Sequence, residues 1–192
     1  MSFLDFMAII ASGFWLFLPA MAPNSAAALF GRKARTKMDF GRSWRGRRIL
    51  GDGKSWLGMF GGAFSGVALG LILMCVSHPF DPSGHWGFGS WGGGLGVLLS
   101  LSFGAILGDV AGAFVKRRLG MERGQKAPVL DQYDFVAGAL LLTLLFFPDW
   151  VLSAYYEGWH ICALIAILAV MFFIHRAVNK IGFRMGVKKE PW

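Results

Sequence analysis

Apolar residues fill five long stretches of this chain, and short polar or charged segments separate each stretch from the next. A helix needs roughly 20 mainly apolar residues to cross the hydrocarbon core of a bilayer. The pattern therefore predicts an all-α integral membrane protein with five transmembrane helices. We expect these spans at about residues 3–22, 57–79, 93–115, 135–153 and 158–175. No Lys or Arg precedes the first stretch, unlike in a signal peptide, so it is interpreted as a retained span.

The composition favours a membrane protein over a soluble one. Hydrophobic residues make up 55% of the 192 residues, and the mean hydropathy is +0.53. Only a bilayer can cover so much apolar surface on so few elements. The length is typical of one domain, so we interpret residues 1–192 as a single membrane domain. A net charge of +8 would suggest nucleic acid in a soluble protein, but here we expect no nucleic-acid partner.

The distribution of cations predicts the orientation. Three segments, at residues 31–56, 116–126 and 176–189, together contain all 19 Lys and Arg residues. Because cations near membrane spans favour the cytoplasmic side, the N-terminus is predicted outside and the C-terminus in the cytoplasm. The cytoplasmic loops are then residues 31–56, which form a long basic loop between the first two helices, and residues 116–133. This predicts a multi-pass protein of the cell membrane.

Asp109 is the most informative single residue. It precedes Lys116 by seven positions and therefore lies about 10 Å deeper in the third predicted helix. An ionised carboxylate inside the membrane is costly, and such residues are usually functional and partnered. Asp109, Gly112 and Lys116 share one helix face, so a structural ion pair with Lys116 or with another helix is the alternative.

Two more carboxylates precede the fourth predicted span. Asp131 and Asp134 are three residues apart and share a helix face, although Asp131 as an N-cap with Asp134 in a capping box is an alternative. Carboxylates from two adjacent helices suit hard, oxygen-seeking Mg²⁺ when phosphates supply further ligands. With the nearby cations, Asp109, Asp131 and Asp134 predict a site for Mg²⁺ and a polyphosphate.

Two further segments contain candidate ligand contacts. Gly51-Asp52-Gly53-Lys54-Ser55 does not match a P-loop, because Arg48 stands where the first glycine belongs, and the motif also needs a preceding strand. Lys54 can still act as a point charge on phosphate, although a loop that lies on anionic lipid headgroups is an alternative. Pro19 and Pro23 predict a break or kink near Asn24, whose amide could contact a ligand or satisfy local backbone.

Small residues recur at every fourth position in the second and third spans, and they predict close helix packing. They are Gly58, Gly62, Gly66 and Gly70, then Gly96, Ser100, Gly104, Gly108 and Gly112. The third span is therefore expected in the interior, with Asp109 facing protein or a wet cavity. Cys75 and Cys162 fall at similar depths, and we favour small buried residues over a disulfide.

Three segments also resemble a known family. LPAMAPNSAAALF, GRRILGDGKSWLGMFGG and GDVAGAFVKRRLGMERGQKAPVLDQYDFVAGAL are similar to CDP-archaeol synthase over about residues 18–140. The third segment also resembles a shortened signature of bacterial CDP-diacylglycerol synthases, through Gly108-Asp109, Lys116-Arg117 and Asp131-x-x-Asp134. Ala113 replaces a serine of that signature, and Ala127-Pro128 replaces its Pro-Gly-His-Gly-Gly.

The resemblance implies transfer of CMP from CTP to the phosphate of 2,3-bis-O-geranylgeranylglycerol, with Mg²⁺ and on the cytoplasmic side of the membrane. The lipid chains would stay among the spans, in contact with membrane lipids. Carried over, the resemblance assigns Mg²⁺ to Asp109, Asp131 and Asp134 and catalysis to Asp109, Asp131 and Lys116. The implied phosphate or nucleotide contacts are Lys54, Lys116, Arg117, Arg118, Asn24 and Asp52.

Other functions are weighed against this one. Another CTP-dependent phosphatidate cytidylyltransferase would share the same features. A small transporter would explain Asp109, but no internal repeat is evident and an odd number of spans does not make two matched halves. A CDP-alcohol phosphotransferase would need Asp-Gly-x-x-Ala-Arg, whereas Lys54-Ser55-Trp56-Leu57 follows Asp52-Gly53. A tethered binding protein leaves Asp109 unexplained. The oligomeric state and the residues that recognise cytosine stay open.

Overall fold

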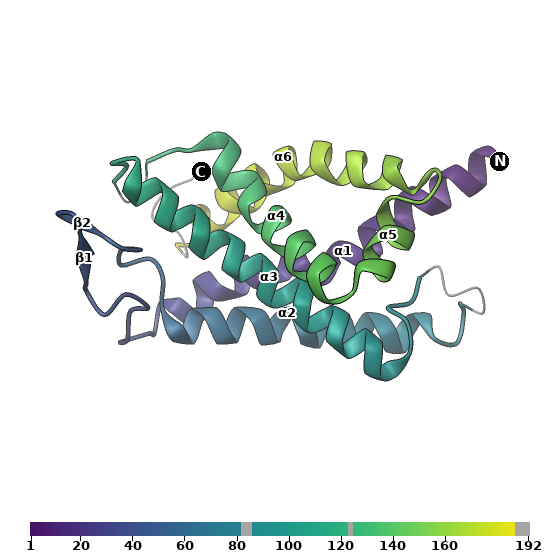
Figure 1. The fold of residues 1–192 in the computed structure, drawn as a ribbon, viewed down its shortest axis with the longest axis horizontal. Helices are drawn as coiled ribbons and strands as arrows, with labels where there is room; N and C mark the ends of the chain where they lie inside the picture. The colour runs from purple at the N-terminus through teal and green to yellow at the C-terminus, as the bar shows by residue number, and fades with distance from the viewer. Residues whose placement is uncertain (82–85, 123–124, 187–192) are drawn as a thin grey trace.

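The computed structural model of the protein describes residues 1–81, 86–122 and 125–186, and it is almost entirely helical. Six helices and one two-stranded antiparallel hairpin follow each other along the chain (Figure 1). They are α1 (Phe3–Gly31), β1 (Ser43–Trp44), β2 (Arg47–Arg48), α2 (Trp56–Ser77), α3 (Trp91–Arg118), α4 (Pro128–Phe146), α5 (Pro148–Tyr155) and α6 (His160–Arg184).

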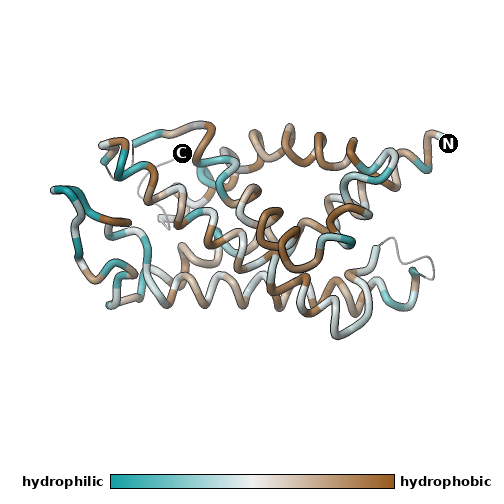
Figure 2. Tube along the Cα trace, viewed as in Figure 1, coloured by the Kyte–Doolittle hydropathy of each residue, from teal (hydrophilic) through white to brown (hydrophobic). Residues whose placement is uncertain are grey.

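Five of these helices, all except the short α5, are long and apolar enough to cross a membrane. The hydrophobic colour follows their tubes, whereas the β1–β2 hairpin is largely hydrophilic (Figure 2). The prediction of five candidate spans in a helical membrane protein is confirmed. The α3 helix is the most buried of the five, because 61% of its apolar 18-residue stretch is buried inside the protein. Its predicted interior position is therefore also confirmed.

The fourth span was predicted too late in the chain. The sequence placed it at residues 135–153, but α4 begins at Pro128 and ends at Phe146. Proline suits the first turn of a helix, where no donor is needed, and inside a helix it removes a backbone hydrogen bond, so many helices end before it. Pro148 therefore ends α4 and begins the separate α5. As a result, Asp131 and Asp134 lie inside α4 rather than before it.

Of the break or kink predicted near Asn24, the break is wrong, because α1 runs through Pro19 and Pro23 without interruption, and the kink stays a prediction. Pro23 has no N–H to donate to the carbonyl of Pro19 four residues earlier. The Ser102 hydroxyl of α3 donates to that carbonyl oxygen at 3.2 Å instead. The freed acceptor thus becomes a polar contact between two helices in an apolar interior.

Glycines bring α2 against α1, as their spacing predicted. A Cβ on Gly62 would lie 2.6 Å from the Pro23 carbonyl oxygen, and one on Gly66 would lie 2.5 Å from that of Pro19. Glycines also bring α3 against α4, since a Cβ on Gly108 would lie 2.1 Å from the Asp134 carbonyl oxygen. Backbones this close are possible only without side chains, so two tight helix pairs, α1–α2 and α3–α4, frame the interior.

Both cysteines are free thiols. Cys162 is half-buried, and Cys75 is exposed, so the prediction that Cys75 is buried is wrong. At this position α2 presents its side chain outward, where small size is not required.

The close approach of α1 and α2 predicts that Gly66→Ala destabilises the fold. The added methyl group would meet the Pro19 carbonyl and the Ser102 hydroxyl at 2.5 and 2.6 Å. Overpacking of this kind costs about 1–3 kcal/mol, so we expect a lower thermal unfolding temperature of the detergent-solubilised protein. Gly92→Ala is the matched control, because no atom of the described chain lies within 4 Å of its added Cβ. Equal unfolding temperatures of the two variants would contradict this packing.

Candidate active site

The loop between α1 and α2 is organised around Asp39, which is only 5% exposed. Its carboxylate accepts from the Arg48 guanidinium at 2.8 and 3.2 Å. It also accepts three backbone N–H groups, from Leu50, Gly51 and Gly41, at 3.1, 2.9 and 3.1 Å. Burial opposes ionisation of Asp39, but the Arg48 guanidinium and these N–H groups outweigh it and lower the pKa of this carboxyl below its usual value. Five hydrogen bonds to one side chain fix the path of the loop.

Sequence reasoning did not single out Asp39 as an organising residue. The available signal was its rarity, because only Asp39 and Asp52 are acidic in the otherwise basic segment 31–56. An acidic residue among many cations is a natural centre for a folded loop, since each lone pair can find a donor.

Arg118 holds the β1–β2 hairpin against the end of α3. Its guanidinium donates to the carbonyl oxygens of Trp44, Arg47 and Arg48 at 2.7, 3.1 and 2.7 Å. It also lies over the rings of Trp44 and Phe114, 5.2 and 5.4 Å from their centroids. The sequence predicted that Arg118 contacts phosphate. In the structure both terminal nitrogens of the guanidinium donate to backbone, so Arg118 anchors the loop, and its contact with phosphate stays a prediction.

Arg117 and Asp52 lie in a second cleft of about 430 Å³, apart from the pocket around Asp109. The Arg117 guanidinium donates to the carbonyls of Leu50 and Met121. Asp52 forms ion pairs with Lys37 and with Arg48, the second at 3.0 Å. The structure therefore places these two predicted nucleotide contacts where the loop meets the end of α3, and it does not bring them to the pocket around Asp109.

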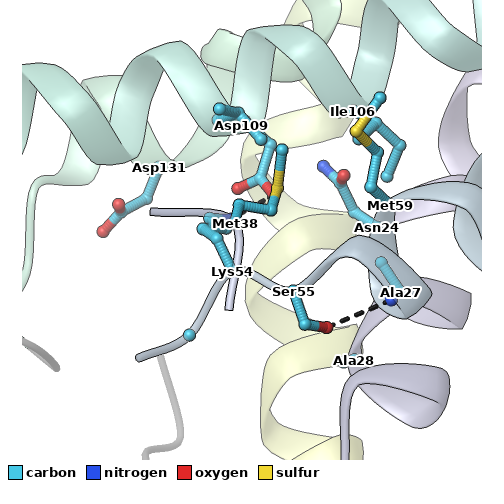
Figure 3. A pocket seen from close by; sticks show the side chains of 13 residues that line it. Asn24, Ala27, Ala28, Met38, Lys54, Ser55, Met59, Ile106, Asp109 and Asp131 are labelled. Atoms are coloured by element: carbon cyan, nitrogen blue, oxygen red, sulfur yellow. Dashed lines mark hydrogen bonds and ion pairs between the residues drawn. The ribbon is translucent and has the colours of Figure 1, made fainter. Parts of the chain in front are cut away.

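A pocket of about 190 Å³ lies between the helices beneath this loop (Figure 3). Side chains of α1, α2, α3 and α4 line it together with the end of the loop. The lining residues are Asn24, Ala27, Ala28, Met38, Gly53, Lys54, Ser55, Gly58, Met59, Ile106, Asp109, Val110 and Asp131. Four of them, Asn24, Lys54, Asp109 and Asp131, were predicted as site residues from the sequence.

Two ion pairs hold the charged groups of the site. The Lys54 ammonium contacts the Asp109 carboxylate across the pocket, with about a fifth to a quarter of each side chain exposed (Figure 3). Lys116 contacts Asp131 at 2.5 Å. The alternative of an ion pair between Asp109 and Lys116 is therefore not the observed arrangement. Each lysine bridges two elements, which is a stronger geometric constraint than a pair within one helix.

Asp134 lies behind this pocket, against the glycines of α3. A Cβ on Gly112 would lie 2.2 Å from its Oδ2 atom. Its carboxyl group interacts electrostatically with Asp109, Lys54 and Lys116, although it does not line the pocket itself. The N-cap alternative is wrong, because Ala127 is the N-cap of α4. Asp131 lies in the first turns of the helix and accepts the Ala127 N–H at 2.9 Å.

The pocket offers oxygen donors that fit a hard divalent cation. Within residues 1–81, 86–122 and 125–186, no three His, Cys, Asp or Glu side chains are clustered tightly enough to hold a metal alone. However, the buried Asn24 Oδ1 atom has no hydrogen-bond partner in this part of the chain. Together with the Asp109 and Asp131 carboxylates it provides oxygen ligands in one pocket. This set suits Mg²⁺, which usually keeps waters and substrate phosphates as further ligands.

Apolar helices that enclose carboxylate–ammonium pairs at one end of the bundle are typical of a membrane protein with a functional polar pocket. The family profile described as CarS-like CDP-archaeol synthase matches residues 6–192. The chain belongs to the CDP-archaeol synthase family, which makes it a cytidylyltransferase.

Curated relatives agree with this assignment along nearly the whole chain. The CDP-archaeol synthase of Methanosphaerula palustris is 47% identical, and that of Methanoregula boonei is 44% identical; each match covers 91% of this chain and 99% of the relative. The Halorubrum lacusprofundi enzyme is 39% identical over 96% of this chain and 98% of its own. A solved structure of an intramembrane enzyme for archaeal membrane lipid biosynthesis is 34% identical, with a TM-score of 0.54, and covers 81% of this chain and 90% of that chain.

The position of Arg118 predicts that Arg118→Lys loosens the loop. A lysine retains the charge but cannot reproduce the planar fork that binds three carbonyl oxygens. We expect faster hydrogen–deuterium exchange at Leu50 and Gly51, whose N–H groups donate to Asp39 in the anchored loop. Arg35→Lys, at an exposed position of the same loop, is the control and should leave this exchange unchanged. Unaltered protection in Arg118→Lys would show that the hairpin needs no anchor.

Proposed function

We propose that the protein transfers CMP from CTP to the phosphate of an archaeal ether lipid with geranylgeranyl chains. The products are CDP-archaeol and pyrophosphate. The observation that supports this most is the pocket in which Lys54 and Asp109 meet between apolar helices, because a water-soluble nucleotide and a lipid headgroup must react at such a boundary. The family relationship supports the same reaction, since its curated members are CDP-archaeol synthases.

The reaction is an in-line displacement at the α-phosphorus of CTP. An oxygen of the lipid phosphate forms a new bond to the α-phosphorus, the bond from that phosphorus to the α,β-bridging oxygen breaks, and this oxygen leaves with pyrophosphate. The lipid phosphate is already anionic near neutral pH, so the mechanism needs no strong general base. Catalysis then consists mainly of positioning and of electrostatic stabilisation of the transferred group.

Lys54 and Lys116 are the proposed phosphate contacts. Both are ammonium donors, and each is held at the pocket by a carboxylate of a neighbouring helix. Their charges offset the repulsion between the triphosphate and the lipid phosphate, which are both anions. Because each lysine side chain is flexible, its ammonium can leave the carboxylate and turn toward the substrate without a change in the helices.

Asp109, Asp131 and the Asn24 oxygen are the proposed ligands of Mg²⁺, with Asp134 in support from behind. A bound Mg²⁺ would neutralise the triphosphate and stabilise the charge that develops on the leaving pyrophosphate. The helices contribute the rigid placement of these oxygens, since the glycine contacts of α3 with α4 fix Asp109 relative to Asp131.

The orientation that we propose places this pocket on the cytoplasmic side, with the N-terminus outside. The basic loop and the basic end of α3 lie together at one end of the bundle, and the N-terminus of α1 lies at the opposite end (Figure 1). Cations gathered at one end favour the cytoplasm at that end, where CTP is available.

The proposed role of Asp109 predicts that Asp109→Asn lowers kcat by about 100-fold or more, the usual effect of removing one electrostatic group from a reaction site. The measurement is release of pyrophosphate from CTP by protein in lipid vesicles that contain the lipid phosphate. Asparagine keeps the shape and an acceptor for Lys54, so the unfolding temperature should stay near that of the wild type. Asp149→Asn, an exposed site at the start of α5, is the control. Near-normal turnover in Asp109→Asn would refute the assignment.

Removal of divalent cations supplies a separate test of the metal. We expect EDTA to stop pyrophosphate release and Mg²⁺ to restore it, because the triphosphate would otherwise remain uncompensated. Binding of CTP, measured by equilibrium dialysis, should weaken in the same samples. Full turnover in EDTA would exclude Mg²⁺ from the mechanism.

A further inference from the structure

Four aromatic side chains form a continuous row along the seam between α2 and α3. Trp56 stacks on Phe60 and Phe60 stacks on Phe64, with centroids 6.1 and 6.4 Å apart. Phe103 of α3 meets Phe60 and Phe64 edge-on, at 6.3 and 5.8 Å. We refer to Trp56, Phe60, Phe64 and Phe103 as the aromatic row. Its position on two helices distinguishes it from aromatic residues that are merely scattered over a lipid-facing surface.

The aromatic row begins beside the candidate active site. Trp56 follows Lys54 by two residues, and Phe60 is next to Met59, which lines the pocket. On α3, Phe103 precedes the pocket residue Ile106 by one helical turn. Met59 and Ile106 lie on the same side of the pocket (Figure 3). Met59 and Ile106 are thus apolar pocket residues that adjoin the aromatic row along α2 and α3, and methionine is the most adaptable apolar side chain.

The α2 rings of the aromatic row are exposed on the outer surface of the seam, and α2 and α3 are in contact beneath them. Phe60 and Phe64 are 43% and 56% exposed, although both are packed against Phe103. The two helices are close both beneath and beyond the rings, since a Cβ on Gly66 would lie 2.6 Å from the Ser102 hydroxyl and one on Gly70 would lie 2.2 Å from Leu98. A chain that lies in the seam can thus run over the rings for about two helical turns and then pass into the bilayer.

We infer that the aromatic row is the seat of one isoprenoid chain of the lipid substrate. This inference rests on the proposed function and deepens it by assigning a path for the chain. The phosphate at the end of the chain would reach Lys54 at the head of the seam, so the surface changes from cationic to aromatic in the order that the substrate requires. Ring faces make extensive dispersion contacts with a methyl-branched, unsaturated chain, and such contacts distinguish it from a straight saturated chain.

A small crevice on the other side of Asn24 is the competing path for the isoprenoid chain. It has a volume of about 50 Å³ and lies between α1, α4 and α6, where Phe135, Met171 and Ile174 line it together with Asn24. It also adjoins the active site through Asn24. Its volume is small for an isoprenoid chain, and its polar lining includes Ser25 and Asn179, so it matches the substrate less well than the open aromatic row.

The test measures kinetics of Phe64→Leu and Phe103→Leu in vesicles, with the lipid phosphate and CTP varied separately. Loss of one aromatic contact changes the affinity for its partner about threefold to tenfold. The KM for the lipid should therefore rise by about this factor, while the KM for CTP stays constant. The preference for geranylgeranyl over saturated chains should fall by a similar factor. Phe173→Leu is the control, because Phe173 is 70% exposed on α6 and is not part of the aromatic row. Leucine keeps each site apolar, and unfolding temperatures check that the variants are folded.

Crosslinking supplies a second measurement that does not depend on turnover. A lipid phosphate with a diazirine in one chain should modify α2 and α3 at the aromatic row. If the wild type is active, two results would overturn this inference alone. They are an unchanged KM for the lipid in both leucine variants, or crosslinks at Phe135 and Met171 in place of the aromatic row. Absence of pyrophosphate release by the wild type in the same vesicles would overturn the proposed function, and this inference with it.

Discussion

The ion pair of Lys54 and Asp109 is the constraint on which the rest of the structure depends. A carboxylate on an apolar helix needs a partner, because burial of an isolated charge is very costly. The partner comes from a loop that must fold back onto the helices to deliver it. The order in that loop follows from this requirement: Asp39 fixes its path, and Arg118 fastens its hairpin to the helix that contains Asp109. Loop and pocket are therefore one unit.

The glycine contacts explain how four helices reach one small pocket. Helices normally pack 8–10 Å apart, and large side chains would hold Asn24, Asp109 and Asp131 too far from one another. Gly62 and Gly66 let α1 approach α2, and Gly108 lets α3 approach α4. Small residues were predicted as packing surfaces without chemistry of their own, and that is how they act. Their effect on the site is indirect, since they set its width.

The sequence predicted those parts of the protein that depend on composition and period. Five apolar stretches, the glycine spacing and a membrane-embedded Asp109 all follow from local pattern, and so does the choice of Lys54 and Asp131 as site residues. The backbone contacts of Arg117 and Arg118 did not follow, because a run of cations reveals charge and not direction. Which guanidinium turns to backbone and which ammonium turns to the pocket is decided by the tertiary fold. The start of α4 was missed because its first turns are polar.

Pairing each carboxylate with a lysine has a consequence for the proposed reaction. In an apolar setting an unpaired charge is costly, so neither partner can be released until another ion replaces it. A metal ion alone would bind the carboxylate and leave the lysine ammonium without an anion. A triphosphate alone would bind the ammonium and leave the carboxylate without a cation. In the proposed reaction Mg²⁺ and CTP together would replace both partners at once: Asp109 and Asp131 would hold the metal, and Lys54 and Lys116 would contact the phosphates. The resting ion pairs thus favour joint binding of metal and nucleotide over binding of either one.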